Sequence, residues 1–324
     1  MYATREEQLL YGSQVEIVKR GEDCTVYRLS GESGEVVMTS YAVFPGIRLI
    51  YNDVHAPRCA TDVSLPLGKV IEIEHCREGR VECEIDGGFL YLAPGDIAIH
   101  GKNDVDRETI FPLSHYHGIT VLLDVEQAPR CLSCILEGVD VCPEALIEKF
   151  CTSPSFYVLR SSPSLEHIFS ELYAVPERIR TGYFKVKLME LLLFLSEFTP
   201  SDVQIGRGYS ASRVQLAKQV SACLLRNLDR HLTISQLSEQ FGVSETQLKT
   251  SFHGVYGVSI YTYARTQKML SAARMLRETG LRVLEIAMCH GYDNGSKFAK
   301  AFRDVLGVSP NEYRCGKREA MGQK

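Results

Sequence analysis

Two short stretches near the C-terminal end place small polar and basic side chains along the outward side of an expected helix. These residues are Thr246, Lys249 and Thr250 in the first stretch, and Ser296, Lys297 and Lys300 in the second. Ammonium and hydroxyl groups of this kind reach phosphate oxygens and the edges of bases. The chemistry indicated is recognition of nucleic acid.

Each stretch has the pattern of two helices joined by a tight turn, over about 234–255 and about 283–306. In the first, Gly242 permits the sharp turn and Ser244 is expected to cap the following helix. In the second, Gly291 and Asp293 are expected to take the same two roles. A plain packed helical hairpin is the structural alternative, but two patterns in register within one segment disfavour it.

A third helix, over residues 259–279, is expected between the two motifs. Its 21 residues span about 30 Å at 1.5 Å per residue. One turn of B-DNA is about 34 Å long. A rigid helix of this length could hold two recognition helices in successive major grooves, so a single chain could contact an asymmetric site.

The charge of the chain is unevenly distributed. Residues 209–324 hold 17 of the 36 Lys and Arg residues but only 9 of the 40 Asp and Glu residues, so this part carries +8 and the remainder −12. A basic segment favours a polyanionic partner, most often nucleic acid, although a solvated basic surface would have the same composition. Two domains with different partners are indicated.

The acidic front part predicts an antiparallel sheet formed by strands from about residue 34 to 124. Short alternating segments over 71–76, 81–85, 89–93, 97–101 and 117–125 are separated by Gly and Pro turns, among them 77–79 and 94–96. The pattern is typical of a sandwich or barrel. The fold class expected is α+β, with a β-rich N-terminal domain and an all-α C-terminal domain.

Helical periodicity begins near residue 143 and is clearest over 164–175 and 177–198. The second helix is apolar on nearly all sides near Leu191–Leu195, so it is expected to be buried inside the domain or against a partner chain. The domains predicted are 1–160 for the β-rich part, 161–200 for a helical region, 201–212 for a linker and 213–316 for the two motifs.

Residues from about 215 to 314 resemble the DNA-binding domain of the AraC/XylS family of transcription regulators. The residues that carry this resemblance are Leu232, Ile234, Leu237, Gly242-Val243-Ser244, Leu248, Phe252, Gly257, Arg274, Leu276, Ile286-Ala287, Gly291-Tyr292, Phe298, Phe302, and Gly307-Val308-Ser309-Pro310 ahead of Tyr313-Arg314. By position, the resemblance assigns DNA contacts to the six outward residues named above and to Gly295. This sequence departs from the family pattern at two of these positions. Thr250 stands where many members have Arg, and Gly295 has no side chain that could contact a base.

The resemblance further implies that the front is a cupin-like barrel that binds a small-molecule effector, followed by helices that form a homodimer. The expected function is a sequence-specific regulator that binds promoter DNA and changes the recruitment of RNA polymerase. It is not expected to be an enzyme or to need a cofactor. The alternative is a cupin-type metal-binding protein or enzyme fused to a DNA-binding domain.

Five residues are candidates for contacting the effector: Arg48, Tyr51, His75, His115 and His117. Arg48 and Tyr51 suit an anionic or aromatic molecule, although a salt bridge and a core tyrosine explain them equally well. His115 and His117 would share one face of a strand, where they could bind an effector, bind a metal or be structural.

Two further sets of residues could hold a metal ion. His75, Glu82 and His100 stand at places comparable to the ligands of cupin enzymes, but Cys76 and Arg77 follow His75, so the expected second His is absent. Cys131 and Cys134, followed by Cys142 and Cys151, could form a zinc site or a redox switch, or could be small buried apolar residues. No metal is predicted.

The protein is expected in the cytoplasm, and no association with a membrane is expected. No apolar run approaches the roughly 18 residues of a membrane span, and the N-terminus lacks the pattern of a signal peptide. The 11 Cys residues are an odd number in a long chain, which favours reduced thiols.

Overall fold

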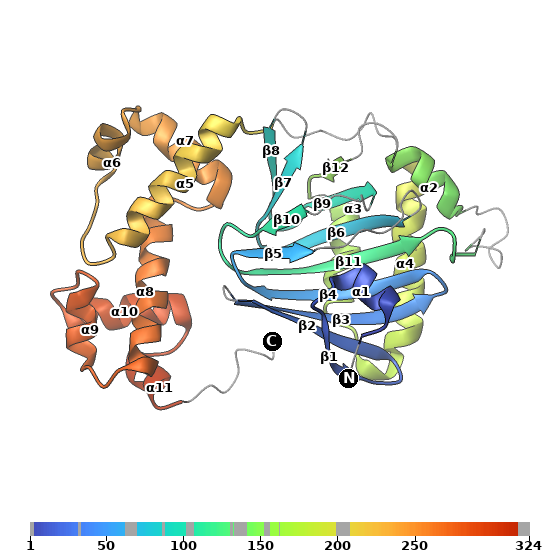
Figure 1. Ribbon diagram of the computed structural model, residues 1–324, viewed down its shortest axis with the longest axis horizontal. Helices are drawn as coiled ribbons and strands as arrows, with labels where there is room; N and C mark the ends of the chain where they lie inside the picture. Colours follow the sequence, from blue (N-terminus) through green and yellow to red (C-terminus); the bar gives the residue numbers. More distant parts are fainter. Residues whose placement is uncertain are drawn as a thin grey trace. The chain divides into compact units, whose positions relative to one another are not determined.

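The computed structural model describes residues 3–31, 34–61, 70–85, 88–101, 107–129, 132, 141–151, 156–161, 163–198 and 208–316. The chain divides into two units, Met1–Gly208 and Tyr209–Lys324 (Figure 1). The first is built on strands and the second is helical. Of the predicted linker, residues 201–207 lie outside the described residues, and Ala211 already begins a helix.

Two antiparallel sheets form the centre of the first unit. The larger has the order β1-β2-β3-β4-β11-β6-β9-β12 and the smaller has the order β5-β10-β7-β8. The strands are β1 Glu16–Arg20, β2 Cys24–Gly31, β3 Gly34–Phe44, β4 Ile47–His55, β5 Arg58–Thr61, β6 Val70–Gly79, β7 Val81–Ile85, β8 Gly88–Leu92, β9 Ile97–Gly101, β10 Arg107–Ile110, β11 Tyr116–Asp124 and β12 Phe156–Leu159. The five predicted strands are confirmed. Strands β1, β2 and β12 were not expected.

The prediction that residues 77–79 turn one strand back onto the next is wrong. Strand β6 continues through Gly79 in the larger sheet, whereas β7 pairs with β8 and β10 in the smaller one. Gly79 has a φ of +86°, and a Cβ there would meet the carbonyl oxygen of His115 at 2.2 Å. The chain therefore crosses between sheets at a point where a side chain does not fit.

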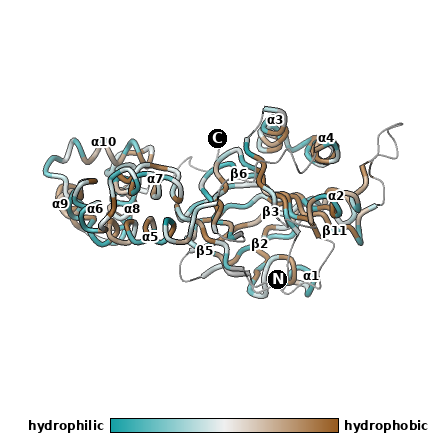
Figure 2. Tube along the Cα trace, turned by 90° about the horizontal axis from the view of Figure 1, so that it is seen from above, coloured by the Kyte–Doolittle hydropathy of each residue, from teal (hydrophilic) through white to brown (hydrophobic). Residues whose placement is uncertain are grey.

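Helices cover the larger sheet. They are α1 Arg5–Tyr11, α2 Pro143–Phe150, α3 Pro163–Leu172, a short 3₁₀ turn Glu177–Ile179, and α4 Arg180–Glu197. Figure 2 shows α3 and α4 on one side of the strands and α1 on the other. No helix in the described part of the chain is long and apolar enough to cross a membrane.

The alternation of side chains divides the core of this unit in two. Odd-numbered residues of β4 and β6, such as Leu49 and Ile73, pack against α3 and α4. Even-numbered residues, such as Ile50, pack with Leu90 and Leu92 of the smaller sheet. Neighbouring residues of one strand, such as Leu49 and Ile50 of β4, can therefore both be buried apolar residues although they face opposite sides.

Near its C-terminal end, helix α4 has apolar residues both on its buried side and on its exposed side. Leu191, Leu192 and Leu195 are buried against the sheet of their own chain. Leu193 and Phe194 are 39% and 40% exposed. The expectation of burial inside the domain is therefore confirmed for one side of the helix. The other side is exposed within this chain, so burial against a partner chain stays a prediction.

The second unit contains α5 Ala211–Arg226, α6 Ile234–Phe241, α7 Glu245–Tyr256, α8 Ile260–Glu278, α9 Val283–Cys289, α10 Gly295–Leu306 and α11 Pro310–Arg314. The two expected helix-turn-helix pairs are α6–α7 and α9–α10 (Figure 1). The expected long helix between them is α8, which is capped by the hydroxyl of Ser259.

In the second unit, the predicted turns between helices are confirmed, and one of the predicted helix caps is wrong. Gly242 ends α6 in the left-handed conformation, with a φ of +65°, and Ser244 caps α7 by accepting from the backbone N–H of Gln247. The cap of α10 is Asn294, not Asp293. The Asn294 amide oxygen accepts from the backbone N–H groups of Ser296 and Lys297, because the helix starts one residue later than expected.

A buried lysine on α8 joins the two halves of this unit. The Lys268 side chain is 9% exposed, and its Nζ donates to the carbonyl oxygen of His290, at 2.9 Å, and to that of Arg230, at 3.1 Å. Arg230 lies before α6 and His290 follows α9, so one ammonium group contacts both helix-turn-helix halves. Burial lowers the pKa of Lys268.

We expect Lys268→Met to lower the free energy of unfolding of the second unit by about 1–3 kcal/mol. Methionine keeps the apolar stem but leaves two buried carbonyl groups without their donor. Chemical denaturation of residues 209–324, followed by circular dichroism, measures this change. Arg274→Met, at an exposed position of α8, is the matched control and should be nearly neutral. Equal stability of the two variants would contradict the role given to Lys268.

Candidate functional site

The first outward face lies on α7. Thr246, Lys249 and Thr250 are all exposed, while Leu248 and Phe252 on the other side are buried. The Lys249 ammonium pairs with Glu245 Oε2 at 3.0 Å, one turn earlier. The hydroxyl of Thr250 donates to the carbonyl oxygen of Thr246 at 2.8 Å. The polar groups of this face are therefore partly satisfied within the helix itself.

The second outward face lies on α10 and is more strongly basic. Ser296, Lys297 and Lys300 are exposed, and Arg303 continues the row one turn further on. The ion pairs recorded among the described residues include none of these three cations. Arg303 was not among the predicted contacts, although its spacing of three from Lys300 could have indicated it. The charge of these cations is therefore not offset by an ion pair among the described residues.

The turn that presents α10 is tightly built. Gly291 has a φ of +75°, and a Cβ there would meet the carbonyl oxygen of Asp229 at 2.6 Å. The neighbouring His290 is buried, and its ring Nδ1 lies 2.7 Å from the carbonyl oxygen of Ile286. Burial lowers the pKa of His290, so the ring is neutral and donates through Nδ1–H.

The first unit has a pocket of about 300 Å³ beside α3. Its lining residues are His75, Arg77, Pro94, Gly95, Ser161, Glu166, Ser170 and Tyr173. The pocket combines a cation, a carboxylate, an imidazole and a phenol. Specific small-molecule sites are hollows of this size or larger with a few placed polar groups.

His75 is the most constrained polar residue of this pocket. It is 2% exposed, and its ring stacks on Phe169 with the centroids 4.2 Å apart. Its Nδ1 lies 3.2 Å from the hydroxyl of Tyr173. Its Nε2 lies 3.5 Å from Glu166 Oε2, yet neither atom makes a hydrogen bond within the described structure. Burial lowers the pKa of His75, although Glu166 opposes this effect.

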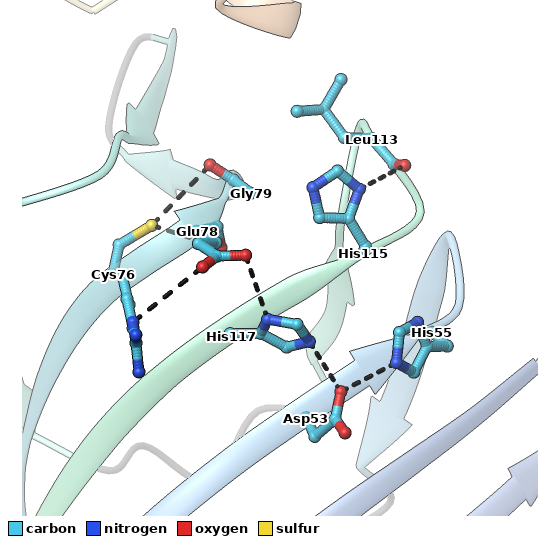
Figure 3. Close-up of polar contacts among 9 residues, drawn as sticks. Asp53, His55, Cys76, Glu78, Gly79, Leu113, His115 and His117 are labelled. Carbon is cyan, nitrogen blue, oxygen red and sulfur yellow. Dashed lines mark hydrogen bonds and ion pairs between the residues drawn. The ribbon is translucent and has the colours of Figure 1, made fainter. Parts of the chain in front are cut away.

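The other four predicted sensing residues do not line this pocket. Tyr51 lies behind it, where its hydroxyl donates to the carbonyl oxygen of Leu172 at 2.6 Å. Arg48 is on the opposite face of β4. His115 precedes β11, and its Nδ1 lies 3.2 Å from the carbonyl oxygen of Leu113. His117 contacts Asp53 and Glu78 instead (Figure 3).

The three ligands suggested by comparison with cupin enzymes do not converge. His75 faces α3, whereas His100 lies on the other face of the sheet beside Glu72 and Glu74. Glu82 belongs to the smaller sheet, where it accepts a hydrogen bond from Tyr91. The interpretation that these three residues share one site is therefore wrong, because the alternation of β6 and β9 turns them apart.

The cysteines form no metal site in the part of the chain that the structure describes. The nine cysteines found there are free thiols, including Cys142 and Cys151. Neither of these two belongs to a group of converging metal-ligating side chains. Cys131 and Cys134 lie outside the described residues.

The sequence of the second unit matches a family model described as a helix-turn-helix domain, over residues 237–315. The transcriptional regulator ExsA of Pseudomonas aeruginosa is 33% identical over 245 residues, which cover 74% of this chain and 82% of ExsA. The transcriptional activator AarP of Providencia stuartii is 26% identical over 112 residues, covering 35% of this chain and 83% of AarP.

Among solved structures, the C-terminal domain of the response regulator AraT from Geobacillus stearothermophilus is 27% identical. It covers 34% of this chain and 91% of its own, with a TM-score of 0.31. The extent of the match to ExsA, which includes both units, decides the family. The chain belongs to the AraC family of DNA-binding transcriptional regulators.

Proposed function

We propose that the chain regulates transcription by placing α7 and α10 in successive major grooves of promoter DNA, under the control of a small molecule held by the first unit. The observation that carries this proposal is the pair of exposed polar faces joined by α8. Its 19 residues span about 28 Å, close to the roughly 34 Å of one turn of B-DNA.

The two faces are proposed to contribute differently. The free cations Lys297 and Lys300 on α10 meet phosphates or guanine edges, and Ser296 assists them. On α7, Lys249 must first exchange its pairing with Glu245 for a phosphate. Thr246 and Thr250 present methyl groups and small acceptors to bases. The uncompensated charge of α10 makes it the larger source of affinity.

We expect Lys300→Ala to weaken operator binding by about 1–3 kcal/mol if the ammonium reads a base, with relaxed specificity at that position. If it contacts only phosphate, affinity falls evenly across sequences. The slope of log affinity against log salt concentration then becomes shallower by about one, because one fewer phosphate is neutralised. The same applies to Lys297→Ala. Fluorescence anisotropy on operator and unrelated duplexes, at several salt concentrations, distinguishes the two cases.

Lys19→Ala, at an exposed position of β1 in the first unit, is the control and should leave DNA affinity unchanged. If both α10 variants bind like the wild type, the recognition face has been assigned to the wrong side of the helix.

The effector is proposed to bind in the pocket at His75. The unused His75 Nε2 and Glu166 Oε2 are buried atoms that a ligand could satisfy. The Arg77 guanidinium lies 4.5 Å from the centre of the Tyr173 ring and offers charge to an acceptor. A small polar molecule with both a donor and an anionic or carbonyl group suits this set. The two sheets around a shared core support a cupin-like interpretation of this unit.

Occupation of the pocket would bias how the first unit holds the DNA-binding unit or its dimer mate. A change in promoter occupancy, and with it in RNA polymerase recruitment, would follow. Of the predicted sensing residues, His75 contacts the effector in this proposal and Tyr51 supports the wall behind Tyr173.

We expect Ser170→Phe, which fills the pocket from α3, to abolish the response to the effector while leaving basal DNA binding intact. A thermal-shift screen of small polar metabolites would first find compounds that raise the Tm of the wild type and change its operator affinity. Ser13→Phe, at an exposed position far from the lining residues in sequence, is the control. Compounds that act equally on Ser170→Phe would place the effector elsewhere.

A second copy of the chain is proposed to cover the open side of α4. Ile179, Val186 and Leu193 are 52%, 64% and 39% exposed and follow one another at seven-residue intervals, with Met189 half-buried between them. An apolar residue at every seventh position, with another in between, is the spacing that packs one helix along another. A homodimer through α4 is the simplest occupant of this stripe.

We expect the double substitution Val186→Glu and Leu193→Glu to produce a folded monomer, because it places charges in the proposed seam. Sedimentation velocity measures the oligomeric state, and circular dichroism verifies folding. Val18→Glu, at an exposed apolar residue of β1, should leave the dimer intact. A folded double variant that remains dimeric would refute the α4 interface. Leu192 is unsuitable for this test because it is buried within its own chain.

A further inference from the structure

Three metal-ligating side chains meet on one face of the larger sheet. Asp53 and His55 are two positions apart in β4, so their side chains lie on the same face. His117 of β11 is directly opposite Asp53 in the antiparallel register. Figure 3 shows the carboxylate of Asp53 between the two imidazole rings.

The ligand atoms already converge. His117 Nε2 lies 2.8 Å from Asp53 Oδ1, and His55 Nε2 lies 2.9 Å from the same oxygen. One ligand atom from each residue lies within 4.8 Å of the others. Ligands held 2.0–2.1 Å from a zinc-class ion lie about 2.9–3.4 Å apart, so small side-chain rotations would complete the set.

A second carboxylate stands behind His117, as is usual for a metal-bound histidine. Glu78 of β6 is opposite His117 in the register, and its Oε2 lies 3.3 Å from His117 Nδ1. Metal-binding histidines commonly donate their other ring N–H to a carboxylate, which fixes the ring and makes it a stronger ligand. This contact leaves Nε2 as the nitrogen that faces Asp53 and His55.

The electrostatics of the group suit a cation. The hydrogen bond from His117 lowers the pKa of Asp53, so this carboxylate is charged at neutral pH. The same contact raises the pKa of His117, because the carboxylate stabilises a positive charge on the ring.

We propose that Asp53, His55 and His117 bind one divalent transition-metal ion of the zinc class, with Glu78 orienting His117. Two imidazole nitrogens and one carboxylate oxygen are borderline ligands that suit Zn²⁺ and Co²⁺ better than Mg²⁺ or Ca²⁺. Three protein ligands leave at least one position for water. None of these four residues lines the pocket at His75, and all four belong to the first unit.

The test is a Co²⁺ titration of the full-length, tag-free chain after treatment with a chelator, followed by visible absorption. Co²⁺ is the probe because its spectrum reports the ligand set, and a thiolate ligand adds an intense charge-transfer band in the near ultraviolet. We expect one Co²⁺ ion without that band, displaced by Zn²⁺. His55→Gln and His117→Gln should abolish its spectrum, and Glu78→Gln should weaken affinity about 10–100-fold.

Two histidine variants are matched controls. His115→Gln removes an exposed histidine two positions before His117, in the turn that precedes β11. His100→Gln removes the histidine of the other converging group, with Glu72 and Glu74. Both should bind Co²⁺ like the wild type. Circular dichroism and operator binding should be unchanged in all variants, which separates loss of the metal from loss of the fold.

Equal Co²⁺ affinity in the wild type and His117→Gln would overturn the proposal and leave these residues as a proton-binding His–Asp–His group. A thiolate band that persists in His55→Gln, or a loss of binding in His100→Gln alone, would overturn it as well, because the metal would then lie elsewhere. Failure of DNA binding in the wild type would bear on the proposed regulatory function and not on this site.

Discussion

The buried ammonium group of Lys268 is the contact on which the geometry of the DNA-binding unit depends. A charge in this position is costly to desolvate, and it persists because two carbonyl oxygens accept from it. These carbonyls belong to the two halves of the unit, at Arg230 and His290. The arrangement of the two recognition helices is therefore held by one side chain in addition to the apolar core.

Helix α8 makes this arrangement stiff because it belongs to both halves. Near its start, Tyr263 packs on Phe252 and Tyr256 of α7. Near its end, Met269, Ala272, Ala273 and Leu276 form one core with Phe298 and Phe302 of α10. A helix whose two ends are built into separate cores cannot rotate one recognition helix without disturbing the other. A fixed spacing suits two sites separated by a fixed length of DNA.

The first unit is organised by a different constraint, the period of two along its strands. Because alternate residues of β4 and β6 face opposite sides, one sheet serves a helix-covered core and an inter-sheet core. His75 is directed to α3, and His100 to the opposite side. On the same face as Tyr51, but nearer the end of β4, the side chains of Asp53 and His55 are exposed. The candidate pocket is therefore lined by the buried His75 of β6, whereas the candidate metal ligands lie at the exposed end of β4 and the start of β11.

The parts of the molecule that depend on local signals can be predicted from the amino-acid pattern of a single segment. Gly242, Ser244 and the spacing of Leu248 and Phe252 predict a helix-turn-helix without knowledge of any distant residue. Five strands of the first unit follow from alternation and turns, whereas β1, β2 and β12 do not. The same pattern predicts Asp293 as the cap of α10, whereas the cap is Asn294. The error arises because moving the start of the helix by one residue leaves the apolar pattern nearly unchanged.

Which distant residues meet depends on how strands and helices pack, so it could not be predicted from any one segment. Asp53, Glu78 and His117 belong to three strands, and His115, the neighbour suggested by sequence, takes no part in their contacts. Glu166 and Tyr173 come to His75 from α3 and the residue after it, about ninety positions away. Strand register, the crossing between sheets at Gly79 and the packing of α3 set these encounters. They depend on contacts between segments, which the pattern of any one segment does not contain.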